Sequence, residues 1–157
     1  TVEHTKTSQS YAGNWICQNF GLFCTANPPD IILQPDLAPG KCWAFPGLQG
    51  QVVIRLPARI WPRAVTVQHV SKTLSPGNDM STSPKDISIS GLDDEGVEIE
   101  LGTFLFDIEK EPKQFFVLKK ELHKEFQYIK VNILSNWGNQ EYTCLYHLKL
   151  HSKKRTA

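Results

Sequence analysis

The sequence predicts an all-β protein, folded as an antiparallel β-sandwich of the jelly-roll type. Ten prolines and ten glycines are spread along the 157 residues, many of them between short apolar stretches, as is typical of strands joined by turns. No long segment repeats its apolar residues with the periodicity of a helix. With 40% hydrophobic residues, the chain suits one domain with a sizeable core.

Residues 1–29 differ from the rest, and we expect them to form an N-terminal segment and an aromatic β-hairpin. Residues 1–9 are polar, whereas residues 11–23 combine several aromatic side chains with Gly13 and Gly21. Because this segment lacks the alternation of a self-sufficient strand pair, we expect it to be flexible when nothing is bound to it.

Residues 30–157 are predicted to form the sandwich itself, with a short basic tail at residues 153–155. Apolar and polar residues alternate most clearly in residues 129–133 and 146–151, where one face of each strand is expected in the core and the other in water. Strands are predicted at residues 51–56, 64–70, 86–92, 98–107, 114–119, 127–134 and 143–151. This many short strands imply a sandwich or a jelly roll.

Charge and motifs argue against several classes of function. The net charge of +1 gives no electrostatic footprint for nucleic acid or for an anionic membrane, and we interpret the basic tail as solvated. No stretch reaches the about 18 apolar residues of a membrane span, and the N-terminus lacks a signal pattern, so we expect any membrane anchor to lie outside these residues. No catalytic motif is present, the acidic run at 93–95 is interpreted as a solvated turn, and no enzymatic activity is predicted.

Several motifs follow one another along the chain. Cys42 and Cys144, roughly 100 residues apart, each lie in an aromatic and glycine-rich context. The motifs are residues 39–47 (PGKCWAFPG), 74–76 (LSP), 83–86 (SPKD) and 136–146 (NWGNQEYTCLY). Together they resemble the SUN domain of nuclear-envelope bridging proteins, from about Asp30 to His151. The resemblance implies the same β-sandwich, with the aromatic hairpin as the segment called the KASH lid.

The resemblance also implies a disulfide bond between Cys42 and Cys144, which the oxidising perinuclear space would permit. Closing a loop of this length is expected to stabilise the fold by about 4 to 5 kcal/mol. Zinc is the competing interpretation, but no Cys-x-x-Cys or His-x-x-x-His pair accompanies these thiols. For Cys17 and Cys24 the sequence leaves two interpretations open. They are either reduced thiols or disulfide-bonded cysteines, for example in a covalent link to a partner.

A cation-binding loop is a further expectation from the resemblance. A tight turn exposes several backbone carbonyl oxygens that a monovalent cation can satisfy. Potassium is the expected ion, and an ordinary turn is the alternative. The carbonyls would come from Ile31, Gln34, Asp36, Lys41 and Tyr146.

The predicted function rests on a peptide site. SUN domains bind the C-terminal tail of KASH proteins, whose terminal carboxylate enters a pocket while the peptide backbone adds to a sheet edge formed with the lid. Hydroxyl groups suit that pocket because they donate charge-assisted hydrogen bonds to a carboxylate. The pocket residues implied by the resemblance are His69, Thr82, Ser83, Tyr142 and Tyr146, and the lid residues are Tyr11, Trp15, Phe20 and Phe23. Thr82 stands where the family commonly has serine.

The resemblance thus implies a luminal adaptor of the LINC complex that links nucleus and cytoskeleton. The domain would lie in the perinuclear space, carried by a homotrimer anchored in the inner nuclear membrane through a coiled coil outside these residues. The short lid and the extra cysteines are more similar to germ-cell SUN proteins and suggest a role in shaping or attaching the sperm nucleus. Two alternatives stay open: a SUN domain with a luminal partner other than KASH, and a carbohydrate-binding jelly roll that stacks sugar on Trp15 or Trp61.

Overall fold

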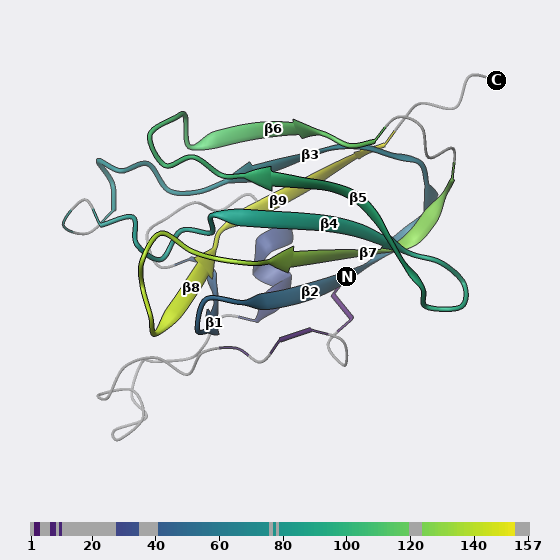
Figure 1. The fold of residues 1–157 in the computed structure, drawn as a ribbon, viewed down its shortest axis with the longest axis horizontal. Helices are drawn as coiled ribbons and strands as arrows, with labels where there is room; N and C mark the ends of the chain where they lie inside the picture. The colour runs from purple at the N-terminus through teal and green to yellow at the C-terminus, as the bar shows by residue number, and fades with distance from the viewer. Residues whose placement is uncertain are drawn as a thin grey trace.

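The computed structural model is a β-sandwich, described for residues 2, 3, 7, 8, 10, 28–34, 41–75, 77, 79–119 and 124–152. All paired strands run antiparallel (Figure 1). One sheet has the order β2 (Gly50–Ile60), β7 (Phe126–Ile133), β4 (Asp86–Leu92), β5 (Glu98–Leu105). The second has the order β6 (Lys113–Val117), β3 (Pro62–Gln68), β9 (His147–Ser152). A two-stranded sheet pairs β1 (Trp43–Pro46) with β8 (Tyr142–Leu145), and the short 3-10 helix η2 (Pro29–Leu33) contacts β1 and β9.

The main hydrophobic core is built by both of the larger sheets. Along β7, Ile129, Val131 and Ile133 are buried in it, whereas the polar residues between them are only half-buried. Val65 of β3 and Leu148 of β9 enter the same core from the second sheet. The alternation that predicted a wet face and a core face on these strands is therefore confirmed, and so is the all-β fold.

Each strand predicted from the sequence overlaps a strand of the structure, but two details of the prediction were wrong. The predicted strand at 143–151 is interrupted at Tyr146, because the chain leaves its pairing with β1 there and begins to pair with β3. Strand β1 was not predicted, since its four residues end in Pro46 and are too few to show a period.

The described part of the N-terminal segment lies along the edge of β2. Val2 forms a bridge with Ile54 and is buried in the main core, although residues 1–9 are mostly polar. The Ser8 amide donates to the Gln51 carbonyl at 2.8 Å, and the Gln51 amide donates to the Ser8 hydroxyl at 2.7 Å. No helix among the described residues is long and apolar enough to cross a membrane.

Candidate functional site

Cys42 and Cys144 form a disulfide bond, as predicted. Their Cα atoms are 5.6 Å apart, and 102 positions separate them in the sequence. With Val70 and Tyr146 they form a second buried cluster, on which the half-buried Tyr142 packs. The competing interpretation, a zinc site, does not apply to these cysteines, because a disulfide leaves no thiolate to bind a metal.

His69 lies next to this cluster, immediately after β3. Its ring meets the Tyr146 ring edge-on, with centroids 4.8 Å apart and planes at 90°. The residue is only 3% exposed, and within the described part of the chain its Nδ1 has no hydrogen-bond partner. Burial lowers the pKa of His69 to about 4, so its imidazole is neutral at physiological pH. The site therefore offers a neutral ring rather than a positive charge.

Thr82 and Ser83 differ in what their hydroxyls can reach. The backbone amide of Cys144 donates to the Thr82 carbonyl at 2.8 Å, which fixes this segment beside β8. The Thr82 residue is half-buried. Ser83 is fully buried, and its hydroxyl donates to the Pro84 carbonyl at 3.3 Å. Of the two predicted donors, Thr82 is the residue that is exposed in part.

Asn136 organises the loop that leads into β8. Its Nδ2 donates to the Asn139 carbonyl at 2.7 Å and to Thr143 Oγ1 at 2.9 Å, and its Oδ1 accepts the Gly138 amide at 2.9 Å. Asn139 Oδ1 in turn accepts the amides of Glu141 and Tyr142 at 2.9 and 3.1 Å. These two asparagines hold the backbone that presents Tyr142. Both lie within a motif used for the resemblance, but no role was predicted for either side chain.

Four of the backbone carbonyls predicted for a cation lie in or next to elements that contact one another. Ile31 and Gln34 belong to η2 and its C-terminal cap, while Lys41 and Tyr146 come shortly before β1 and β9, the strands that η2 contacts. The Ile31 carbonyl accepts the Gln34 amide at 3.1 Å, and a carbonyl has a second lone pair for an ion. Asp36 lies outside the described residues. Among those that are described, no three His, Cys, Asp or Glu side chains gather as metal ligands.

The predicted lid also lies outside the described residues. This covers Tyr11, Trp15, Phe20 and Phe23, together with Cys17 and Cys24. Trp61, the other candidate for stacking on a sugar, is half-buried and already interacts with another group of the protein.

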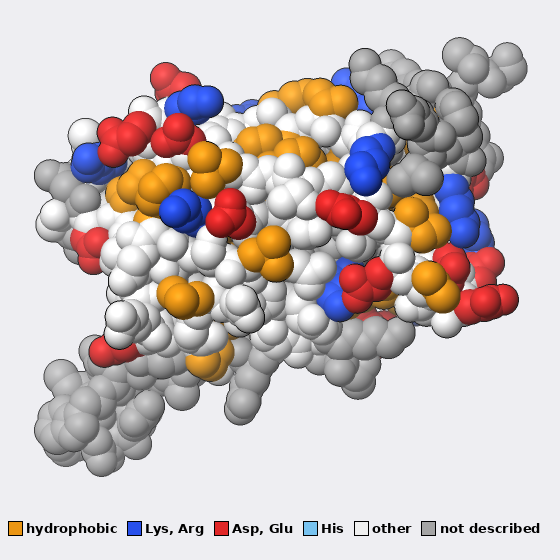
Figure 2. All heavy atoms as spheres, viewed as in Figure 1, with side chains coloured by type: hydrophobic (Ala, Val, Ile, Leu, Met, Phe, Trp, Pro, Cys, Tyr) orange, Lys and Arg blue, Asp and Glu red, His pale blue; other side chains and the backbone are white. Residues whose placement is uncertain are grey.

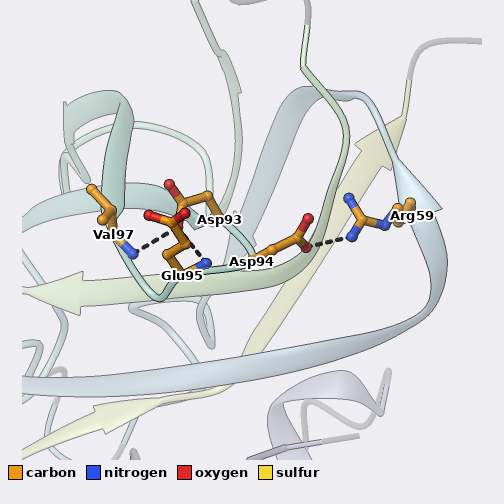
Figure 3. Close-up of polar contacts among 5 residues, drawn as sticks. All are labelled: Arg59, Asp93, Asp94, Glu95 and Val97. Atoms are coloured by element: carbon orange, nitrogen blue, oxygen red, sulfur yellow. Dashed lines mark hydrogen bonds and ion pairs between the residues drawn. The ribbon is translucent and has the colours of Figure 1, made fainter.

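The acidic run at 93–95 forms the turn between β4 and β5 (Figure 3). The Asp93 carboxylate accepts the amides of Glu95 and Val97 at 2.9 and 2.8 Å, and Gly96 has the positive φ of 81° that the turn requires. Asp94 forms an ion pair with Arg59. The acidic run thus lies in a turn, as the sequence indicated, and its Asp93 side chain stabilises that turn.

His69 is expected to make the stability of the fold depend on pH. Its pKa is about 4 in the folded protein and close to 6.5 in the unfolded chain, so below pH 6.5 the unfolded state takes up a proton that the folded state does not. We expect this group to lower the free energy of unfolding by roughly 2 to 3 kcal/mol between pH 7 and pH 4.5. Urea denaturation of the native protein and of His69→Gln at both pH values measures this loss of stability. If the stability of the two proteins depended on pH in the same way, the prediction for His69 would be wrong.

Comparisons with known proteins agree with the sequence analysis. Residues 22–154 match the family described as Sad1 / UNC-like C-terminal. The chain is 43% identical to SUN domain-containing protein 3 of Mus musculus, over 96% of this chain and 49% of that protein. It is 38% identical to Sperm-associated antigen 4 protein of Rattus norvegicus, over 96% of this chain and 35% of that protein. The chain thus spans about half or less of these relatives.

A solved structure with the same fold is the family 32 carbohydrate-binding module from Streptococcus pneumoniae EndoD. Its TM-score is 0.71, with 16% sequence identity, and the likeness covers 98% of this chain and 95% of that one. At this identity the likeness concerns the sandwich alone.

Proposed function

This chain belongs to the Sad1/UNC-like, or SUN domain, family, and on that premise we propose that it binds the C-terminal tail of a KASH protein. Membership associates the chain with the nuclear envelope and with the LINC complex, whose SUN components are adaptors. The observation that carries the proposal is the meeting of His69, Thr82, Tyr142 and Tyr146 around one disulfide-linked cluster.

The chemistry of the site suits a peptide carboxylate. Thr82 and Tyr142 are half-buried residues, and in this proposal their hydroxyls donate hydrogen bonds to an anion that arrives from solvent. The neutral His69 beneath Tyr146 adds ring nitrogens without adding a buried charge. In the proposed trimer, the lid residues Tyr11, Trp15, Phe20 and Phe23 clamp the rest of the peptide as an added strand.

The proposal places this domain in the perinuclear space, carried by a protein anchored in the inner nuclear membrane. The Cys42–Cys144 disulfide supports that location, because such bonds persist in compartments continuous with the endoplasmic reticulum lumen and are rare in the cytosol. The 38% identity to a sperm-associated protein supports a role in male germ cells, where the bridge would shape or attach the sperm nucleus.

The proposal includes a potassium ion beside the disulfide. The carbonyls of Ile31, Gln34, Lys41 and Tyr146 would hold it with that of Asp36, and its charge would stabilise converging carbonyl oxygens. Its support is that η2, which carries Ile31, contacts β1 and β9, the strands that begin shortly after Lys41 and Tyr146.

Two conservative substitutions test the pocket. Tyr142→Phe and Thr82→Val each remove one hydroxyl, and each is expected to weaken binding of a KASH-type C-terminal peptide by about 1 to 3 kcal/mol. Isothermal titration calorimetry on the domain fused to a trimeric coiled coil measures this. Tyr128→Phe and Thr103→Val, which make the same changes on β7 and β5, are the matched controls. Unchanged affinity in both pocket variants would remove these residues from the site.

A further inference from the structure

The outer face of the β6-β3-β9 sheet collects cations and exposed apolar residues. Antiparallel register aligns Val117 and His151 on either side of Ala64, and Phe115 and Lys149 on either side of Thr66. One step further along, Lys113 and His147 flank Gln68. Because Phe116 and Leu148 point into the core, the alternating residues point outward. We call the outward residues of the two flanking strands the β6–β9 face: Lys113, Phe115, Val117, His147, Lys149 and His151.

The β6–β9 face is positively charged. It contains no Asp or Glu, and neither Lys113 nor Lys149 forms an ion pair within the described part of the chain. The field of these cations also acts on the face itself. Burial, and then the charges of Lys149 and Lys113, lower the pKa of His147. Burial also lowers the pKa of His151, followed by the charges of Lys149, Arg63 and Lys113.

The apolar residues of this face protrude into solvent. Phe115 is 53% exposed and Val117 is 52% exposed. Both lie on β6, the edge strand of this sheet, which pairs with β3 alone. Figure 2 shows hydrophobic side chains gathered over β6, at the upper edge of the molecule. The Phe115 ring packs against the His151 ring, with centroids 5.4 Å apart. His151 is itself held by a 2.8 Å hydrogen bond between its Nε2 and Thr66 Oγ1.

We propose that the β6–β9 face docks onto an anionic membrane surface. Phe115 and Val117 would enter the interfacial layer of the bilayer, while Lys113 on the same strand and Lys149 on β9 contact lipid phosphates beside them. Protruding apolar side chains between cations fit a soft, planar, negatively charged partner, whereas a peptide would need a recess for its own side chains. The net charge of +1 gave no indication of this face, because acidic residues elsewhere in the chain balance its cations.

Co-sedimentation of the 157-residue chain with lipid vesicles tests the proposal. The chain is expected to bind vesicles of phosphatidylcholine containing about one-third phosphatidylserine, and to bind pure phosphatidylcholine at least about tenfold more weakly. Added salt should weaken the binding. Lys113→Glu/Lys149→Glu should lower the affinity about tenfold or more, and Phe115→Ser/Val117→Ser should do the same at constant charge.

Matched controls separate the face from general surface effects. Lys72→Glu/Lys124→Glu changes two exposed lysines outside the face, and Leu48→Ser/Leu134→Ser changes two apolar residues that are 42% and 43% exposed. Both controls should bind like the native chain. Equal binding to the two kinds of vesicle, no binding to either, or equal losses in control and face variants would overturn the proposal. The test uses no residue of the peptide pocket, so its failure leaves the proposed function standing.

Discussion

Cys144→Ser is expected to lower the free energy of unfolding by about 4 to 5 kcal/mol under oxidising conditions. The reason is the length of the loop that the bond closes. With 102 positions between Cys42 and Cys144, the disulfide removes a large part of the conformational freedom of the unfolded chain. Chemical denaturation with and without a reducing agent measures the effect.

The controls distinguish the bond from the packing of the sulfur atoms. Cys42→Ser and the double variant should lose about as much stability as Cys144→Ser, since each breaks the same bond. In the presence of the reducing agent, native protein and variants should unfold at similar denaturant concentrations. A loss that is equally large in both conditions would mean that the serine hydroxyl, and not the missing bond, destabilises the fold.

Asn136→Ala is expected to lower the free energy of unfolding by roughly 2 to 3 kcal/mol and to weaken peptide binding as well. The Asn136 side chain is buried and connects the Asn139 carbonyl, Thr143 Oγ1 and the Gly138 amide. Alanine would leave the fully buried Thr143 hydroxyl without this donor, and would remove the bonds that hold the Asn139 carbonyl and the Gly138 amide in the loop. The loop that presents Tyr142 would then lose its support, so binding should fall even though no contact residue is changed.

Asn132→Ala is the matched control for this prediction. Asn132 lies four positions earlier on the half-buried face of β7, where a truncation is expected to change stability by less than about 0.5 kcal/mol. Thermal unfolding and peptide titration of both variants measure the two effects. If Asn136→Ala and Asn132→Ala behaved alike, the hydrogen-bond network would not be what holds the loop.

The fold was predictable where the sequence shows a period. Strand β7 alternates Ile129, Val131 and Ile133 with polar residues, and the structure buries those three. Strand β1 is too short for such a pattern, and the break at Tyr146 depends on which strand the chain pairs with next. Pairing partners that lie about 100 residues away cannot be read from local periodicity.

The candidate site was predictable only in part, and through the resemblance. It led to the Cys42–Cys144 bond, which spacing alone could not assign. The interior position of the Ser83 hydroxyl and the role of Asn136 depend on the tertiary fold, because neighbours in space decide which polar groups are satisfied. The β6–β9 face was hidden for the same reason, since its cations come from separate strands.

The most direct test of the central claim compares two peptides that differ in one group. The domain, fused to a trimeric coiled coil, is titrated with a KASH-type C-terminal peptide and with the same peptide amidated at its C-terminus. The account predicts binding of the free carboxylate and a loss of at least about tenfold on amidation, because the pocket hydroxyls would lose a charged acceptor. Equal affinity for both peptides, or binding of neither, would contradict a carboxylate-binding site at Thr82, Tyr142 and Tyr146.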